Sequence, residues 1–269
     1  MNAATGLDDT FAQIAQSFGG SGTVTLAVNA ANFDIDDALD AGTRTLSFTS
    51  TGSVSESGTG GISAGFLSGS SQGAVALGAT TNAISKIGSF NTGGNAFSLT
   101  NSIALNVTGH VDTDSAALTL KTLSGGLTIT SIVDGGAVTL QSVSTISEAT
   151  NGRILATSLS GSAAGNVTLT SSNNTISALG AFTRNGAGDF KLTDAHDLSL
   201  EGWLNYTGGN VTLNVTGTVT ENGGVISATT LTGSSTGATT LGGNNHIAAL
   251  GAFTQTGAGD FDLNDGQGL

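Results

Sequence analysis

The chain has 269 residues, of which 42 are glycine and none is proline or cysteine. Proline removes a backbone donor and is kept out of strands that pair on both edges, so its absence suits a structure built from such strands. Missing cysteine excludes a disulfide framework. The 19 acidic and 6 scattered basic residues give a net charge of −13, which excludes a basic surface for nucleic acid. No apolar run approaches the roughly 18 residues that span a bilayer, so we expect no membrane insertion.

The first 21 residues differ from the rest of the chain. Leu7, Phe11, Ile14 and Phe18 share one face of a helix, and the pair Gly19-Gly20 offers a stop. Repeat arrays need capped ends, because a terminal coil otherwise exposes apolar core and an unpaired strand edge. The sequence therefore predicts a short amphipathic capping helix over residues 1–21. The alternative is a frayed terminus that happens to be amphipathic.

A short motif recurs along the remaining chain: a glycine, a spacer, and two apolar residues separated by a small polar one, as in Gly165-Asn166-Val167-Thr168-Leu169. This alternation directs the apolar side chains to one face of a strand and threonine or serine to the other. Steps between successive motifs are mostly 20 to 23 residues, and three are 28 or 29. The apolar pairs are Val24/Leu26, Leu46/Phe48, Val75/Leu77, Phe97/Leu99, Leu118/Leu120, Val138/Leu140, Val167/Leu169, Phe190/Leu192, Val211/Leu213, Thr239/Leu241 and Phe261/Leu263.

The three longer coils resemble one another. Each contains a glutamate, at Glu56, Glu148 or Glu221, and then a Leu-Ser/Thr-Gly-Ser run. The coil that follows carries Asn-x-Ile-x-x-Ile/Leu-Gly-x-Phe. The glutamates recur several coils apart, too far to form one acid pair. Their regular spacing indicates a structural role, such as a bond to turn amides.

These observations predict an all-β fold, a right-handed parallel β-helix of 20–23-residue coils with three 28–29-residue coils. One strand of this kind cannot bury its apolar face alone, whereas stacked coils pair every backbone group with the coils above and below. Parallel strands joined by crossovers are right-handed in nearly all cases. We expect the β-helix to cover residues 22–269 and to continue beyond the C-terminus. A string of antiparallel β-sandwich domains is the alternative.

Asp112, Asp114 and Asp134 are the candidate site residues, because they fall at similar places in consecutive coils and could lie within several ångströms of one another. Stacked aspartates on a β-helix can bind calcium or act as the acid pair of a polysaccharide-cleaving enzyme. The alternative is ordinary turn chemistry. His110, His196 and His246 occupy different places in the repeat, and no metal spacing links them. Apart from calcium at the aspartates, the sequence predicts no cofactor, no metal and no catalytic residue.

The only tryptophan and tyrosine, Trp203 and Tyr206, lie three residues apart. They could stack on a sugar ring or pack over a corner of a coil. The column of residues between the apolar pairs is rich in threonine, but threonine is simply a good strand residue.

Over residues 22–269 the chain resembles the β-helical shafts of filamentous-haemagglutinin-like exoproteins and autotransporter passengers. The resemblance rests on the repeat, on its Gly-x-Val-Thr-Leu motif and on a surface rich in Gly, Thr, Ser and Asn without cysteine. The resemblance implies a secreted or cell-surface location and a non-catalytic role as an adhesin, filament or biofilm component. Its partner would be a glycan, a cell-surface receptor or another copy along the rod. The chain departs from such families in lacking a signal peptide and an Asn-Pro-Asn-Gly secretion motif. The alternative function is a β-helical polysaccharide lyase, hydrolase or phage-tail depolymerase.

Overall fold

The structure is a computed structural model that describes residues 22–28, 32–149 and 151–268. The described chain forms an all-β parallel β-solenoid of about 11 turns with roughly 21 residues per turn and no helix, which confirms the predicted fold class. It divides into two compact units, Met1–Gly136 and Ala137–Leu269. The predicted capping helix over residues 1–21 lies outside the described residues.

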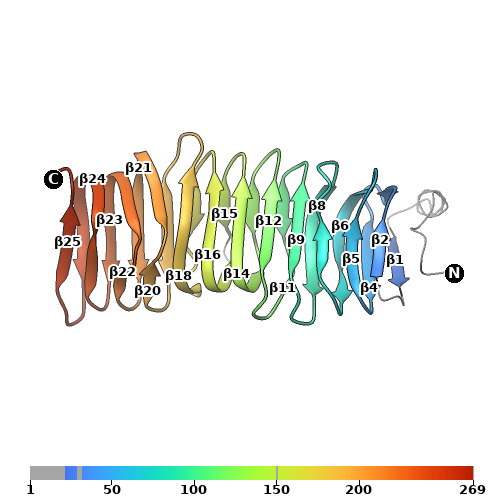
Figure 1. The fold of residues 1–269 in the computed structure, drawn as a ribbon, viewed down its shortest axis with the longest axis horizontal. Coiled ribbons are helices and arrows are strands. Elements are labelled where there is room, and N and C mark those ends of the chain that lie inside the picture. The colour runs from blue at the N-terminus through green and yellow to red at the C-terminus, as the bar shows by residue number, and fades with distance from the viewer. Residues whose placement is uncertain (1–21, 29–31, 150, 269) are drawn as a thin grey trace. The chain divides into compact units, whose positions relative to one another are not determined.

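In the first unit, strands of successive turns pair in parallel, as β9 and β12 do side by side in Figure 1. The strands of this unit are β1 (Thr23–Val28), β2 (Asn32–Ile35), β3 (Ala38–Asp40), β4 (Thr45–Ser50), β5 (Ser53–Glu56), β6 (Gly61–Ser71), β7 (Val75–Leu77), β8 (Ala83–Asn91), β9 (Phe97–Asn101), β10 (Leu105–Val107), β11 (Val111–Asp112), β12 (Leu118–Thr122) and β13 (Leu127–Ile129). β14 (Ile132–Ser142) begins in this unit and ends in the next.

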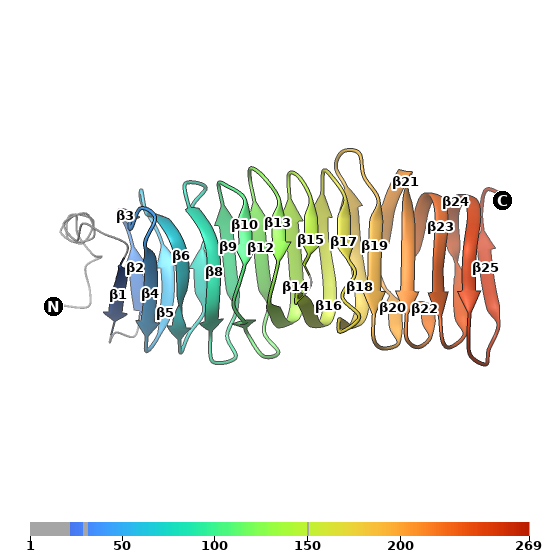
Figure 2. The same ribbon diagram turned by 180° about the vertical axis from the view of Figure 1, so that it is seen from behind.

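The second unit is built in the same way, and β21 and β23 pair in parallel over most of their length (Figure 2). Its strands are β15 (Ile146–Glu148), β16 (Arg153–Ala163), β17 (Val167–Leu169), β18 (Thr175–Arg184), β19 (Phe190–Asp194), β20 (Leu198–Leu200), β21 (Trp203–Val215), β22 (Val219–Glu221), β23 (Val225–Ser235), β24 (Thr239–Gln255) and β25 (Phe261–Asp265).

The predicted inward residues are confirmed from Leu46 to Leu241, since both members of each pair are buried. They form the solenoid interior together with the apolar residues of the other strands of each turn. The polar residues between them face outward, as period-two alternation requires.

The prediction of three longer coils is wrong. Leu46 lies opposite Leu67, only 21 residues on, and Val75 lies opposite Val54 in a different stack of strands. Likewise Val167 pairs with Ile146. Thr239 pairs with Val219, while Val211 pairs with Leu231. Each turn carries several inward strands of similar sequence. The motif therefore occurs in different stacks of strands along the chain. A longer step between two motifs reflects a change of stack and not an insertion.

The Leu-Ser/Thr-Gly-Ser run has a packing reason. In each copy its glycine lies opposite the phenylalanine of the next turn, as Gly161 does opposite Phe182, with a local shift of register. A methyl group at Gly161 would overlap the Leu140 carbonyl oxygen of the turn before and would lie 2.8 Å from Phe182 Cζ. The Phe182 ring in turn packs on Phe190, with ring centroids 5.2 Å apart. Glycine thus lets consecutive turns close over a buried phenylalanine.

We therefore expect Gly161→Ala to lower the free energy of unfolding by about 2–3 kcal/mol, because backbone and ring must both move to admit the methyl group. Gly242→Ala is the matched control, since a Cβ there meets no atom within 4 Å. Denaturant unfolding of both variants measures the difference. Equal stabilities would show that the close approach at Gly161 carries no packing constraint.

Candidate functional site

In the described part of the solenoid, three polar clusters recur around a buried asparagine, and each links three successive turns. In one copy, Asn174 is fully buried and its Oδ1 accepts a hydrogen bond from the Ile154 amide at 2.7 Å. Its Nδ2 donates to Glu148 Oε2 at 3.0 Å, and the same carboxylate oxygen accepts the Ser171 amide at 2.9 Å. In the next turn Asp194 Oδ1 accepts the Ile176 amide. We call these the Glu–Asn–Asx clusters: Glu56–Asn82–Asn101, Glu148–Asn174–Asp194 and Glu221–Asn245–Asp265.

The predicted bond from each glutamate to a backbone amide between strands is confirmed for Glu56 and Glu148, with Ala79 and Ser171 as donors, and Glu221 accepts the amide of Gly243 within β24. Burial raises the pKa of Glu148 to about 7, although the hydrogen bonds from Ser171 and Asn174 act in the opposite direction. Burial also raises the pKa of Glu56 and Glu221. These carboxyl groups belong to the framework of the solenoid, because their partners are the backbone and the cluster asparagine.

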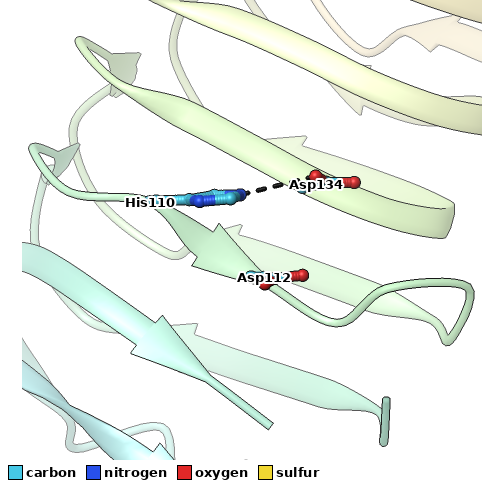
Figure 3. Close-up of side chains that lie close together, drawn as sticks. All are labelled: His110, Asp112 and Asp134. Atoms are coloured by element: carbon cyan, nitrogen blue, oxygen red, sulfur yellow. Dashed lines mark ion pairs between the residues drawn. The ribbon is translucent and has the colours of Figure 1, made fainter. Parts of the chain in front are cut away.

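A different group of side chains meets on the surface of the first unit (Figure 3). His110, Asp112 and Asp134 each place one nitrogen or oxygen atom within 4.8 Å of the other two, and all three are half-buried. The dashed line in Figure 3 joins His110 Nε2 to Asp134 Oδ2 at 3.4 Å. We call these three residues the His–Asp–Asp cluster.

Strand geometry brings the His–Asp–Asp cluster together. His110 and Asp112 flank the inward-facing Val111, so they share the outer face. Asp134 lies opposite Asp112 one turn later, in register along β11 and β14. The His110 carbonyl accepts the Phe90 amide at 2.8 Å, which holds this segment against β8.

The Asp112 carboxylate is fixed on both sides. Asn91, opposite it in β8, donates from Nδ2 to Asp112 Oδ2 at 2.7 Å. The Asp114 amide donates to Asp112 Oδ1 at 2.9 Å. Burial and the negative charge of Asp112 raise the pKa of Asp134, Asp114 adds to this effect, and His110 opposes it.

Of the three predicted aspartates, the structure brings Asp112 and Asp134 together and leaves Asp114 in an exposed turn with φ of 51°. For Asp114 the turn interpretation is therefore the better one. Sequence reasoning missed His110 as a member of the cluster. The signal was its position two residues before Asp112, directly before β11, which places both side chains on the outer face.

The alternation of side chains along β21 places Trp203 and Tyr206 on opposite faces of the strand. Tyr206 is completely buried against Phe190, with ring centroids 5.3 Å apart. Trp203 faces outward with 53% of its surface exposed, and its Nε1 donates to Ser227 Oγ at 3.0 Å. Only Trp203 can therefore meet a ligand.

Trp203 in the second unit and His110 in the first occupy the same place in the repeat. Each precedes an inward residue that lies opposite the phenylalanine of the repeated motif, Phe182 or Phe90. Each ring points at the side chain of the next turn, which is Ser227 for Trp203 and Asp134 for His110. The same backbone framework thus holds Trp203, Asn205 and the buried Ser227 in one unit and the His–Asp–Asp cluster in the other.

Comparisons with protein-family models, with curated proteins and with solved structures found no match. The class that the structure defines is the parallel β-solenoid, and the resemblance to filamentous-haemagglutinin-like proteins remains an interpretation of the repeat. Among the described residues, no helix is long and apolar enough to cross a bilayer.

Proposed function

We propose that this chain is a non-catalytic structural and adhesive segment of a secreted or cell-surface protein. In this role the solenoid presents outward side chains to a glycan, to a receptor on another cell, or to another copy of itself. The observation that carries the proposal is the contrast between a repeated framework and varied outer residues. The Glu–Asn–Asx clusters repeat three times, whereas equivalent surface positions hold Trp203 and His110.

The framework supports this role physically. In parallel stacking, each strand makes its backbone hydrogen bonds with the strands of the neighbouring turns. The outward side chains can therefore differ from turn to turn without disturbing the interior. The outer faces of the strands are mostly threonine, serine and asparagine, whose short polar side chains can exchange hydrogen bonds with sugar hydroxyls.

Trp203 is the contact residue that we assign to a glycan. Its exposed ring offers an apolar face to the C–H side of a sugar, and the bond from Nε1 to Ser227 Oγ limits its rotation. A ring that is already fixed loses little conformational entropy when a ligand binds. The neighbouring Asn205 lies on the same face of β21 and can donate to a sugar hydroxyl.

The proposal is tested by measuring binding of the purified chain to a panel of immobilised polysaccharides and to whole cells. We expect Trp203→Ala to weaken glycan binding roughly tenfold, which corresponds to about 1.4 kcal/mol. Val143→Ala is the matched control, because Val143 is also 53% exposed in the second unit. Absence of binding by the wild-type chain to every surface would contradict the adhesive role.

One observation favours the alternative of a polysaccharide-cleaving enzyme. Asp112 and Asp134 have carboxylate oxygens within 4.8 Å of each other, a separation compatible with an acid pair. The same incubations decide between the two functions, since an enzyme would release reducing ends or unsaturated sugars from a polysaccharide. Release that disappears in Asp134→Asn would replace the adhesive proposal with a catalytic one.

A further inference from the structure

We infer that the His–Asp–Asp cluster is a binding site for one divalent cation of the zinc or manganese kind, held by His110 Nε2 and by one carboxylate oxygen each from Asp112 and Asp134. This site is separate from the glycan contact at Trp203 and does not depend on it.

The first support is the distance between the donor atoms. Ligands that lie about 2.1 Å from a shared ion are at most about 4.2 Å from one another. The three donor atoms already lie within 4.8 Å, with His110 Nε2 and Asp134 Oδ2 only 3.4 Å apart. Small side-chain rotations therefore close the cluster around an ion without any movement of the strands.

The second support is the way in which the ligands are mounted. Asp112 and Asp134 are opposite each other on paired strands, and His110 shares the outer face of Asp112. Outside the cluster, Asn91 Nδ2 and the Asp114 amide both donate to the Asp112 carboxylate. Partners of this kind orient a ligand before the ion arrives, as outer-shell hydrogen bonds do in metal sites.

The third support is charge. His110 Nε2 has no solvent-accessible surface and no hydrogen bond of normal geometry, although it faces the Asp134 carboxylate. Asp112 and Asp134 bring two carboxylates opposite each other on paired strands, and the exposed Asp114 lies two residues from Asp112. A dication in the cluster would reduce the repulsion between the carboxylates and would accept the lone pair of the neutral His110 Nε2.

The fourth support comes from the second unit. There the equivalent positions hold Trp203, Asn205 and Ser227, with a hydrogen bond from Trp203 to Ser227, in the same backbone pairing. The solenoid therefore needs none of the three cluster residues for its fold. In the first unit all three of these positions hold side chains that are common metal ligands.

The donor set also selects the kind of ion. A mixed set of one imidazole nitrogen and two carboxylate oxygens suits zinc and other first-row divalent ions. Calcium prefers six to eight oxygen ligands, and the cluster provides a nitrogen where the predicted calcium site required a third aspartate. The remaining coordination positions face solvent and would hold water.

The test is isothermal titration of the purified full chain with zinc chloride and, separately, with manganese chloride and calcium chloride. We expect one saturable site for zinc or manganese per chain, with calcium at least tenfold weaker. His110→Gln, Asp112→Asn and Asp134→Asn should each weaken the binding at least tenfold. Asp262→Asn is the matched control, since this aspartate is exposed on a strand outside the cluster, and it should bind like the wild type.

Circular dichroism of each metal-free variant guards against loss of the fold, and a variant that does not fold is replaced by His110→Ala or Asp134→Ser. A folded wild-type chain without a saturable site for zinc or manganese would overturn the inference. Metal binding that all three substitutions leave unchanged would also overturn the inference, because it would indicate a weak attraction of the ion to the acidic surface as a whole. Tighter binding of calcium than of zinc would overturn the choice of ion.

Discussion

Asn174→Ala should lower the free energy of unfolding by about 3–5 kcal/mol, because the substitution removes hydrogen bonds to three partners at once and leaves the buried Ile154 amide without an acceptor. The Ile154 amide loses its acceptor at 2.7 Å, and Glu148 Oε2 loses a donor at 3.0 Å. The Thr193 carbonyl loses a donor at 3.1 Å. Each buried polar group left without a partner costs about 1–3 kcal/mol.

The size of the effect also reflects where these partners lie in the chain. Ile154 precedes Asn174 by one turn, and Thr193 follows it by one turn. The asparagine side chain therefore ties three turns together where strand pairing alone would leave amides unpaired. Alanine removes this link and leaves a small void that water reaches poorly.

Guanidinium unfolding followed by circular dichroism measures the loss, and hydrogen exchange at the Ile154 amide reports local opening where a repeat array does not unfold in one step. Asn173→Ala is the control, because Asn173 is exposed and only its backbone amide is bonded, to Ser171 Oγ. It should change stability by less than about 0.5 kcal/mol. Similar stabilities for the two variants would mean that the Glu–Asn–Asx cluster is not what ties the turns together.

The fold class was predictable because it rests on a local rule. Alternation of Val167, Thr168 and Leu169 is enough to assign a strand with one buried face, and repetition of that strand indicates a solenoid. The role of Glu148 was also predictable, since a buried carboxylate needs donors and turn amides are the donors at hand. Both inferences need only the residue and its near neighbours.

The features that were missed depend on which turn lies on which. Leu67 and Val75 have the same sequence character, and only the pairing of β6 with β4 and of β7 with β5 tells their stacks apart. Asn174 looks like a loop residue in the sequence, but the turn above and the turn below enclose it. His110 gains its partner Asp134 from the next turn. Register between turns is a tertiary property, and the local pattern does not encode it.

Asp194→Asn should stabilise the protein at neutral pH by up to about 3 kcal/mol. Asp194 is fully buried, its Oδ1 accepts the Ile176 amide at 3.0 Å, and its Oδ2 makes no hydrogen bond of normal geometry. The corresponding residue of the first unit is Asn101, whose Nδ2 donates to the carbonyls of Ile84 and Ile103 at 2.9 Å each. An asparagine at this position therefore makes hydrogen bonds with both side-chain atoms, which the aspartate does not.

The direction of the pH dependence follows from the pKa. Burial raises the pKa of Asp194 from 3.8 to about 6, against the smaller effects of the hydrogen bond from Ile176 and the amides that follow. Below pH 3.8 the carboxyl group is protonated in both the folded and the unfolded state. As the pH rises to 6, the unfolded chain ionises first, and the folded state loses about 1.4 kcal/mol for each unit of pKa shift. Above pH 6 this loss is complete.

The variant Asp194→Asn escapes this loss, so its advantage over the wild type should be small at pH 3.5 and fully developed at pH 7. Glu148 titrates in both proteins with a pKa of about 7, so the difference between them isolates Asp194. The measurement is a series of denaturant titrations from pH 3.5 to pH 8. A difference that stays constant over this range would show that the Asp194 carboxyl group does not titrate in the folded interior.

The reciprocal substitution Asn101→Asp provides the matched test in the first unit. It replaces an amide that donates to two carbonyls with a buried carboxyl group, so the protein should lose stability at pH 7 and recover part of it on acidification. At pH 7 the two substitutions should change the free energy of unfolding in opposite directions, and both changes should shrink at low pH. That result would show that this one asparagine or aspartate position sets the pH dependence in both units. Equal signs would mean that the surroundings of Asp194 have adapted to its charge, and that the two clusters are not interchangeable.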